Sequence, residues 1–139
     1  MCATRRTETS IIERINSSRL SQPPGYSHIV VASGSRLVTT AGAVPLDAEG
    51  NLVGPGDRFA QARQTLENLA LALEAIGATA RDVIKTTVYV VADDRADLAV
   101  VWRAVQESGM ADTASTLLGV SLLGYEGQLV EIEAIAVLE

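Results

Sequence analysis

The sequence predicts a single α+β domain in which one β-sheet carries two long helices on one face. Its 139 residues match the size of one compact domain and leave no room for a second. Hydrophobic residues make up 47% of the chain and charged residues 20%, so a proper core can form. Segments with strand character and segments with helical spacing follow each other without strict alternation, which favours α+β over α/β.

The first part of the chain is predicted to be an extension followed by a hairpin. Residues 1–19 are polar and rich in Arg, and we interpret them as an N-terminal extension of a domain at 20–139. Residues 29–32 and 37–41 are short, β-branched, apolar runs separated by Ser-Gly-Ser. This spacing predicts a β-hairpin with a three-residue loop.

A helix of about five turns is the clearest prediction in the chain. Between residues 59 and 76, apolar side chains recur at spacings of three and four, which places them on one helical face. Asp57 precedes this run as an N-cap, and Gly77 follows it where a helix commonly ends.

The remaining elements complete the predicted sheet and add a second helix. A strand rich in Val, Ile and Thr is followed by an apolar helical stripe that begins after Asp94 and stops at Gly109. Two further apolar runs are separated by a glycine-containing turn. The predicted elements are a strand at 83–91, a helix around 98–105, and strands at 115–123 and 128–138.

The last predicted strand has an unusual face. Alternation places Val130 and Ile132 on one side, whereas Glu131 and Glu133 share the other side with apolar residues further along. One interpretation is a solvated outer face. The other is an oligomer interface or cleft, in which a carboxylate can orient water or accept a hydrogen bond. Both interpretations stay open on the residues alone.

Composition excludes several classes of site. Residues 1–19 carry four Arg and two Glu, so of the total charge of −6 the remaining 120 residues carry −8, which disfavours binding to nucleic acid. One His and one Cys cannot build a structural zinc site or an intrachain disulfide. With no apolar run of membrane-spanning or signal-peptide length, we expect a cytoplasmic protein with no membrane contact, no metal and no cofactor.

Five motifs together resemble the RidA/YjgF family, also labelled L-PSP endoribonuclease or translation inhibitor. The resemblance covers about residues 20–138, and its last two motifs carry most of the specificity. The motifs are 25–27 (GYS), 40–47 (TAGAVPLD), 61–68 (QARQTLEN), 83–90 (VIKTTVYV) and 130–137 (VEIEAIAV).

The resemblance implies a chorismate-mutase-like (YjgF-like) subunit that forms a homotrimer with ligand clefts between neighbouring subunits. Active members hydrolyse 2-imino or enamine acids to 2-oxo acids and ammonia. In them an Arg holds the substrate carboxylate in a bidentate manner, while a Glu and backbone groups place the attacking water. The matching ligand positions here are Tyr26, Gly42 and Glu131, with Ser115 flanking the pocket and Glu131 as the water-orienting catalytic candidate.

The sequence departs from the family at the position of that Arg. The alignment places Ala114 there, and no Arg or Lys follows Arg103. The resemblance therefore implies a trimer that binds or hydrolyses small imine, enamine or related metabolites, with weak or absent 2-imino acid deaminase activity. The alternative is a non-catalytic trimer that binds or senses a small metabolite. An endoribonuclease is a third hypothesis, which the charge of −8 opposes.

Overall fold

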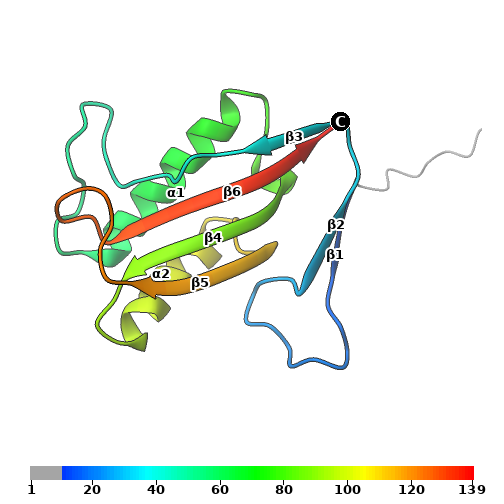
Figure 1. The fold of residues 1–139 in the computed structure, drawn as a ribbon, viewed down its shortest axis with the longest axis horizontal. Helices are drawn as coiled ribbons and strands as arrows, with labels where there is room; N and C mark the ends of the chain where they lie inside the picture. Colours follow the sequence, from blue (N-terminus) through cyan, green and yellow to red (C-terminus); the bar gives the residue numbers. More distant parts are fainter. Residues whose placement is uncertain (1–10) are drawn as a thin grey trace, which may run out of the picture.

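A four-stranded sheet forms the centre of the molecule, and both helices lie on one of its faces (Figure 1). In the computed structural model, which describes residues 11–139, the strand order is β3-β6-β4-β5. β6 is antiparallel to β3 and β4, whereas β4 and β5 are parallel. The predicted α+β class with one helix-covered face is confirmed. The strands are β3 (Arg36–Thr39), β4 (Val83–Val91), β5 (Ala114–Val120) and β6 (Val130–Leu138).

The two helices begin where the sequence places their caps. α1 spans Arg58–Glu74, and the Asp57 carboxylate accepts a hydrogen bond from the Ala60 N–H at 3.0 Å. α2 spans Arg95–Glu107 and begins with a capping box between Asp94 and Asp97. A short 3₁₀ helix, η1 (Ala80–Asp82), leads into β4. In residues 11–139, neither helix is long and apolar enough to cross a membrane.

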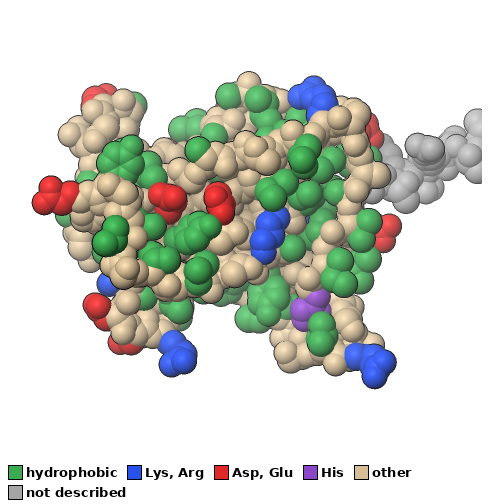
Figure 2. Space-filling view, in the orientation of Figure 1, with side chains coloured by type: hydrophobic (Ala, Val, Ile, Leu, Met, Phe, Trp, Pro, Cys, Tyr) green, Lys and Arg blue, Asp and Glu red, His purple; other side chains and the backbone are tan. Residues whose placement is uncertain are grey.

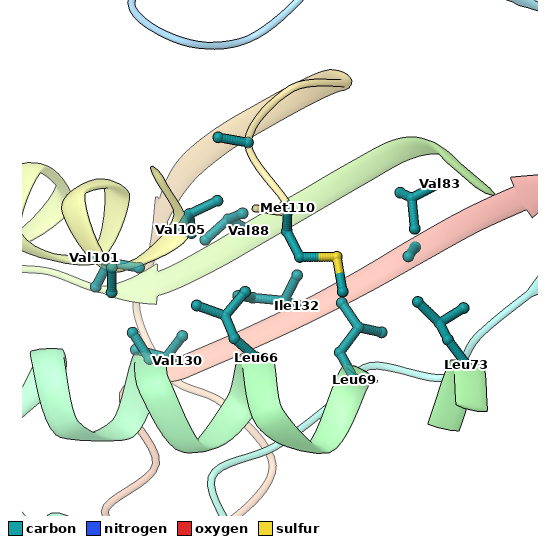
Figure 3. Packing of buried hydrophobic residues seen from close by; sticks show 14 of the residues in the cluster. Leu66, Leu69, Leu73, Val83, Val88, Val101, Val105, Met110, Val130 and Ile132 are labelled. Carbon is teal, nitrogen blue, oxygen red and sulfur yellow. The ribbon is translucent and has the colours of Figure 1, made fainter. Parts of the chain in front are cut away.

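The core lies between the helices and the covered face of the sheet. Leu66, Leu69 and Leu73 of α1 point toward the sheet. Val101 and Val105 of α2 pack into the same core at one end (Figure 3). Every second residue of β6 from Val130 to Ala136 is buried, as the alternation predicts. The intervening side chains therefore face the uncovered side of the sheet, which we call the outer face.

The predicted hairpin between residues 29–32 and 37–41 is wrong. β2 (Ile29–Ala32) pairs antiparallel with β1 (Ile12–Ile15) in a separate two-stranded sheet, and β3 pairs with β6. A β-branched run marks a strand but does not choose its partner. Here all four residues of β2 pair with Ile12–Ile15. The Ser33 N–H extends this pairing by donating to the Ile11 carbonyl at 2.8 Å.

Part of the expected N-terminal extension belongs to this two-stranded sheet. Ile12 is buried, and the Arg14 side chain donates to the carbonyls of Asp112, Arg81 and Val83. These contacts fasten β1 to the start of β4. The domain boundary at residue 20 stays a prediction, and residues 1–10, with Cys2, lie outside the described residues.

Candidate functional site

The outer face of the sheet brings together the polar residues that strand alternation turns away from the helices. Glu131 and Glu133 on β6 lie opposite Tyr89 and Thr87 on β4. Figure 2 shows acidic and basic side chains in the middle of this face, with apolar side chains around them. Because exposed apolar patches with polar side chains at their edges mark interaction sites, this face is the candidate binding surface.

Gly42 lies directly against the carboxylate of Glu131. Two hydrogen bonds between Ala43 and Ile132, of 2.7 and 3.1 Å, hold this segment beside β6. A Cβ atom at Gly42 would lie 2.3 Å from Oε2 of Glu131, a distance that no side chain tolerates. The structure thus joins two residues that the sequence predicts for the ligand site, and only glycine leaves room for the carboxylate.

A buried glutamine holds the other oxygen of Glu131. Nε2 of Gln128 donates to Oε1 of Glu131 at 3.1 Å and to the Val130 carbonyl at 3.0 Å. Its Oε1 accepts from the Tyr125 N–H at 3.1 Å, so the amide is fixed at both ends. Gln128 is 3% exposed. The Glu131 carboxylate is therefore held in one position, and its second oxygen faces Gly42.

Glu133 is paired with a tyrosine across the strands. The Tyr89 hydroxyl donates to Oε1 of Glu133 at 2.6 Å. The pKa of Tyr89 is raised above its usual value because this hydrogen bond favours the neutral phenol and because the charges of Glu133 and Glu131 oppose a phenolate. Tyr89 is consequently a neutral hydrogen-bond donor at physiological pH.

A small cavity on the outer face lies beside this pair. Its volume is about 220 Å³, and it contains the chain's single lysine, Lys85. Nζ of Lys85 donates to Oγ1 of Thr116 at 2.8 Å, and the β4–β5 register places Lys85 beside Ala114. The cavity is lined by Thr39, Thr40, Lys85, Thr87, Glu133, Ala134 and Ile135.

Tyr26 and Ser115 lie in a different depression, of about 320 Å³, at the edge of β5 next to α2. The Tyr26 ring packs edge-on against Trp102 at 6.3 Å between centroids, and the Trp102 indole N–H donates to the Pro24 carbonyl at 2.8 Å. Ser115 is on the helix side of the sheet, where its hydroxyl accepts from Thr86 at 2.7 Å.

Within one chain, then, the predicted site residues fall into two groups. Gly42, Ala114 and Glu131 are on the outer face, whereas Tyr26 and Ser115 are at the β5 edge. Depressions of about 430 and 460 Å³ lie away from both groups, between the helices and beside Arg14, whereas one of about 370 Å³ between α1 and the segment 38–44 includes Gly42. In residues 11–139, no group of three or more His, Cys, Asp or Glu side chains could hold a metal ion.

Sequence reasoning missed three residues around the two glutamates. Lys85, Tyr89 and Gln128 all contact or border the two glutamates. The signal for the first two was present, because alternation along residues 83–91 places Lys85, Thr87 and Tyr89 on one face. Gln128 carried no such signal, since its role depends on the turn before β6.

Comparison with known proteins identifies the family. Residues 17–138 match the family described as Endoribonuclease L-PSP. The chain belongs to this family. A 2-iminobutanoate/2-iminopropanoate deaminase of Salmonella typhimurium is 37% identical over 105 residues, which cover 73% of this chain and 79% of the deaminase.

Solved structures of this family, also called the Rid family, share the fold. The Rid protein YyfB from Yersinia pestis has a TM-score of 0.86 at 36% identity, over 92% of this chain and 99% of YyfB. E. coli TdcF, solved with bound serine, has a TM-score of 0.64 at 30% identity, over 74% of this chain and 81% of TdcF. A member of the same fold thus binds a small metabolite.

Proposed function

We propose that this chain is a Rid-type protein that assembles as a homotrimer and binds small imine or enamine metabolites in clefts between its subunits, hydrolysing them slowly. The observation that carries the proposal is the Glu131 carboxylate, which Gln128 and Gly42 fix on an uncovered face of the sheet. The deaminase relative supports the substrate class.

The fixed carboxylate suits the hydrolysis of a C=N bond. Glu131 accepts a proton from a bound water as the water oxygen attacks the imine carbon. Glu131 passes this proton to the imine nitrogen, which regenerates the carboxylate, and the resulting carbinolamine transfers its hydroxyl proton to the amine as it collapses to a carbonyl and ammonia. Holding water and imine in one place supplies the orientation that solution lacks.

The split between the two groups of site residues supports a site shared by two copies. Tyr26 and Ser115 line a depression at an open sheet edge, and Glu131 is on the outer face of the same sheet. A neighbouring subunit that brings its β5 edge onto this outer face would unite the two groups. The family resemblance implies the same arrangement.

Ala114 is the reason for the expected slow turnover. An Arg at this position would hold a substrate carboxylate with two parallel hydrogen bonds. Losing a charged partner costs about 1.5–3 kcal/mol, or roughly ten- to 150-fold in affinity. The same residue favours the alternative of a metabolite-binding trimer without turnover. The endoribonuclease in the family's description fits less well, since two carboxylates on the outer face repel phosphate.

Ammonia release from freshly generated 2-iminopropanoate tests the proposal. We expect measurable release by the wild type and at least a tenfold lower rate for Glu131→Gln. Glu126→Gln, an exposed turn residue, is the matched control and should keep the wild-type rate. Equal rates for the wild type and Glu131→Gln would contradict the hydrolase. A ligand-induced rise in Tm without turnover would support the binding protein instead.

A further inference from the structure

The chain has eleven Lys and Arg residues, and ten of them are Arg. The single Lys is Lys85, which lies on the outer face of β4. Ala114 is beside it on β5, and Glu133 is on the other neighbouring strand, β6. In residues 11–139, no carboxylate oxygen lies within 4 Å of its Nζ, so its charge is not neutralised by an ion pair. A hydrogen bond to Thr116 fixes its direction.

The lining of the cavity next to Lys85 contains charges of both signs. Lys85 supplies the cation and Glu133 the anion, and three threonines also line the cavity. Its volume of about 220 Å³ is below the range of drug-sized pockets, roughly 300–1,000 Å³. Such a cavity suits a ligand of a few heavy atoms that carries a carboxylate and a nitrogen donor.

We propose that Lys85 is the anion anchor of this protein and binds the carboxylate of a small imino or amino acid. This inference rests on the proposed function and names the cation that the sequence alone did not find. An ammonium is a compact point charge rather than a planar fork, so it attracts a carboxylate but fixes its orientation less strictly than Arg. Binding with slow turnover follows from that difference.

Calorimetric titration with pyruvate tests the role of Lys85, with uncharged methyl pyruvate as the second probe. Lys85→Met should weaken pyruvate binding at least tenfold, and Lys85→Arg should keep it within about threefold. Arg63→Met removes an exposed positive charge on α1 and should leave the Kd unchanged. Methyl pyruvate should bind the wild type and Lys85→Met equally.

A labelling experiment checks the same contact directly. Because Lys85 is the only lysine, reductive methylation followed by mass spectrometry reports on it alone, apart from the N-terminal amine. Pyruvate should protect Lys85 at least threefold. Unchanged Kd in Lys85→Met together with no protection would overturn the inference. If Glu131→Gln still abolished imine hydrolysis, the proposed function would survive that result.

A separate observation concerns two open strand edges. In residues 11–139, β2 pairs only with β1, and β3 pairs only with β6. Val31 on β2 is 51% exposed and Leu37 on β3 is 71% exposed. In the antiparallel register that the three-residue connection 33–35 would set, these two side chains lie directly opposite each other. Unpaired edges with exposed apolar residues are ready to accept another strand.

We infer that β2 of one copy pairs with β3 of a second copy, so that the strand pair predicted as a hairpin forms between chains. Residues 33–35 connect β2 to β3 without the two strands pairing in one chain, as the hinge of an exchanged element must do. Such pairing would cover Val31 and Leu37 and close both free edges.

Disulfide trapping distinguishes exchange from a hairpin within one chain. In a Cys2→Ser background, Val31→Cys and Leu37→Cys would have Cα atoms about 4.5–5.5 Å apart if the strands pair, within disulfide range. We expect oxidation to give covalent multimers on a non-reducing gel. A control with Val31→Cys and Arg63→Cys should stay monomeric. A cross-link confined to monomers, or none at all, would overturn the inference.

Discussion

Glu131 is the residue on which the candidate site is built, and its neighbours restrict it from two sides. Gln128 fixes one carboxylate oxygen, and the backbone of Gly42 approaches the other more closely than any side chain would allow. A carboxylate held in this way loses little freedom when it binds water or a ligand. We propose that the close approach at Gly42 serves the candidate ligand site as well as the packing.

Replacing Gly42 with Ala should disturb this carboxylate without unfolding the protein. The new Cβ would collide with the end of a flexible side chain, and the backbone conformation at Gly42 is one that alanine can adopt. We expect at least a tenfold loss of ligand affinity and a Tm within a few degrees of the wild type. Gly124→Ala has open space around its Cβ and serves as the control. Unchanged affinity in Gly42→Ala would contradict a ligand site at Glu131.

Tyr89 should show its contact with Glu133 in its titration. Because the pKa is higher in the folded state than in the unfolded chain, the stabilisation is fully present below about pH 10 and is lost as pH rises through the raised pKa. Absorbance at 295 nm, taken as the difference between wild type and Tyr89→Phe, should give a midpoint above 10. Glu133→Gln should lower that midpoint. A midpoint at or below 10 would show that the pair does not form.

At the scale of elements, α1 fixes the loops that lead to the site. Gln61 is fully buried, and its side chain bonds the carbonyls of Gly54 and Gly127 at 3.1 Å and the Leu129 N–H at 2.7 Å. Two turns further along the helix, Asn68 donates to the carbonyls of Val44 and Leu46, both at 2.8 Å. The helix thereby places the loop that carries Gly42 and the turn that precedes β6.

Gln61→Leu should destabilise the fold more than any surface glutamine does. It leaves three backbone groups without their partner in a buried place, at about 1–3 kcal/mol for each group that stays unsatisfied. We expect the free energy of unfolding to fall by about 2–4 kcal/mol in urea titrations. Gln64→Leu loses a single bond to Asn68 and should cost less than about 1 kcal/mol. Equal effects of the two variants would contradict the bridging role of Gln61.

The sequence predicted the elements better than their partners. Period and caps are local properties, so α1, α2, β4 and β6 follow from the residues themselves. The pairing of β2 with β1 was not predicted, because β1 lies in a segment that is mostly polar. Only one of its four residues is a buried isoleucine, which is too few to show the alternation of a strand. Gln61 was missed for a similar reason. A glutamine on a helix is expected in solvent, and its buried partners come from two distant loops.

The site was predictable only in part, because its residues come from separate strands. Glu131 and Gly42 were found through the family motifs, and the structure brings them together. From the sequence, a cation for the ligand carboxylate was expected only near Ala114, the position that aligns with the Arg of the family. Lys85 lies almost thirty residues earlier in the chain, and only the parallel pairing of β4 with β5 places it beside Ala114.

At the scale of the whole molecule, the proposed ligand site requires contact between two copies of the chain. One chain presents two glutamates and a lysine on an uncovered sheet face, and an aromatic depression around Tyr26 at the edge of the same sheet. Exposed apolar residues such as Leu37 add to the case for contact between subunits. The net charge of −8 on residues 20–139 disfavours phosphate-rich partners.

Restoring the anion clamp tests the central claim most directly. If the outer face is a Rid-type pocket that lacks only its planar cation, Ala114→Arg should speed ammonia release from 2-iminopropanoate about tenfold or more, and the gain should vanish in Ala114→Arg/Glu131→Gln. Ala114→Gln, with a long uncharged side chain, should give no gain. A rate for Ala114→Arg equal to that of the wild type, in a protein that melts normally, would contradict the account.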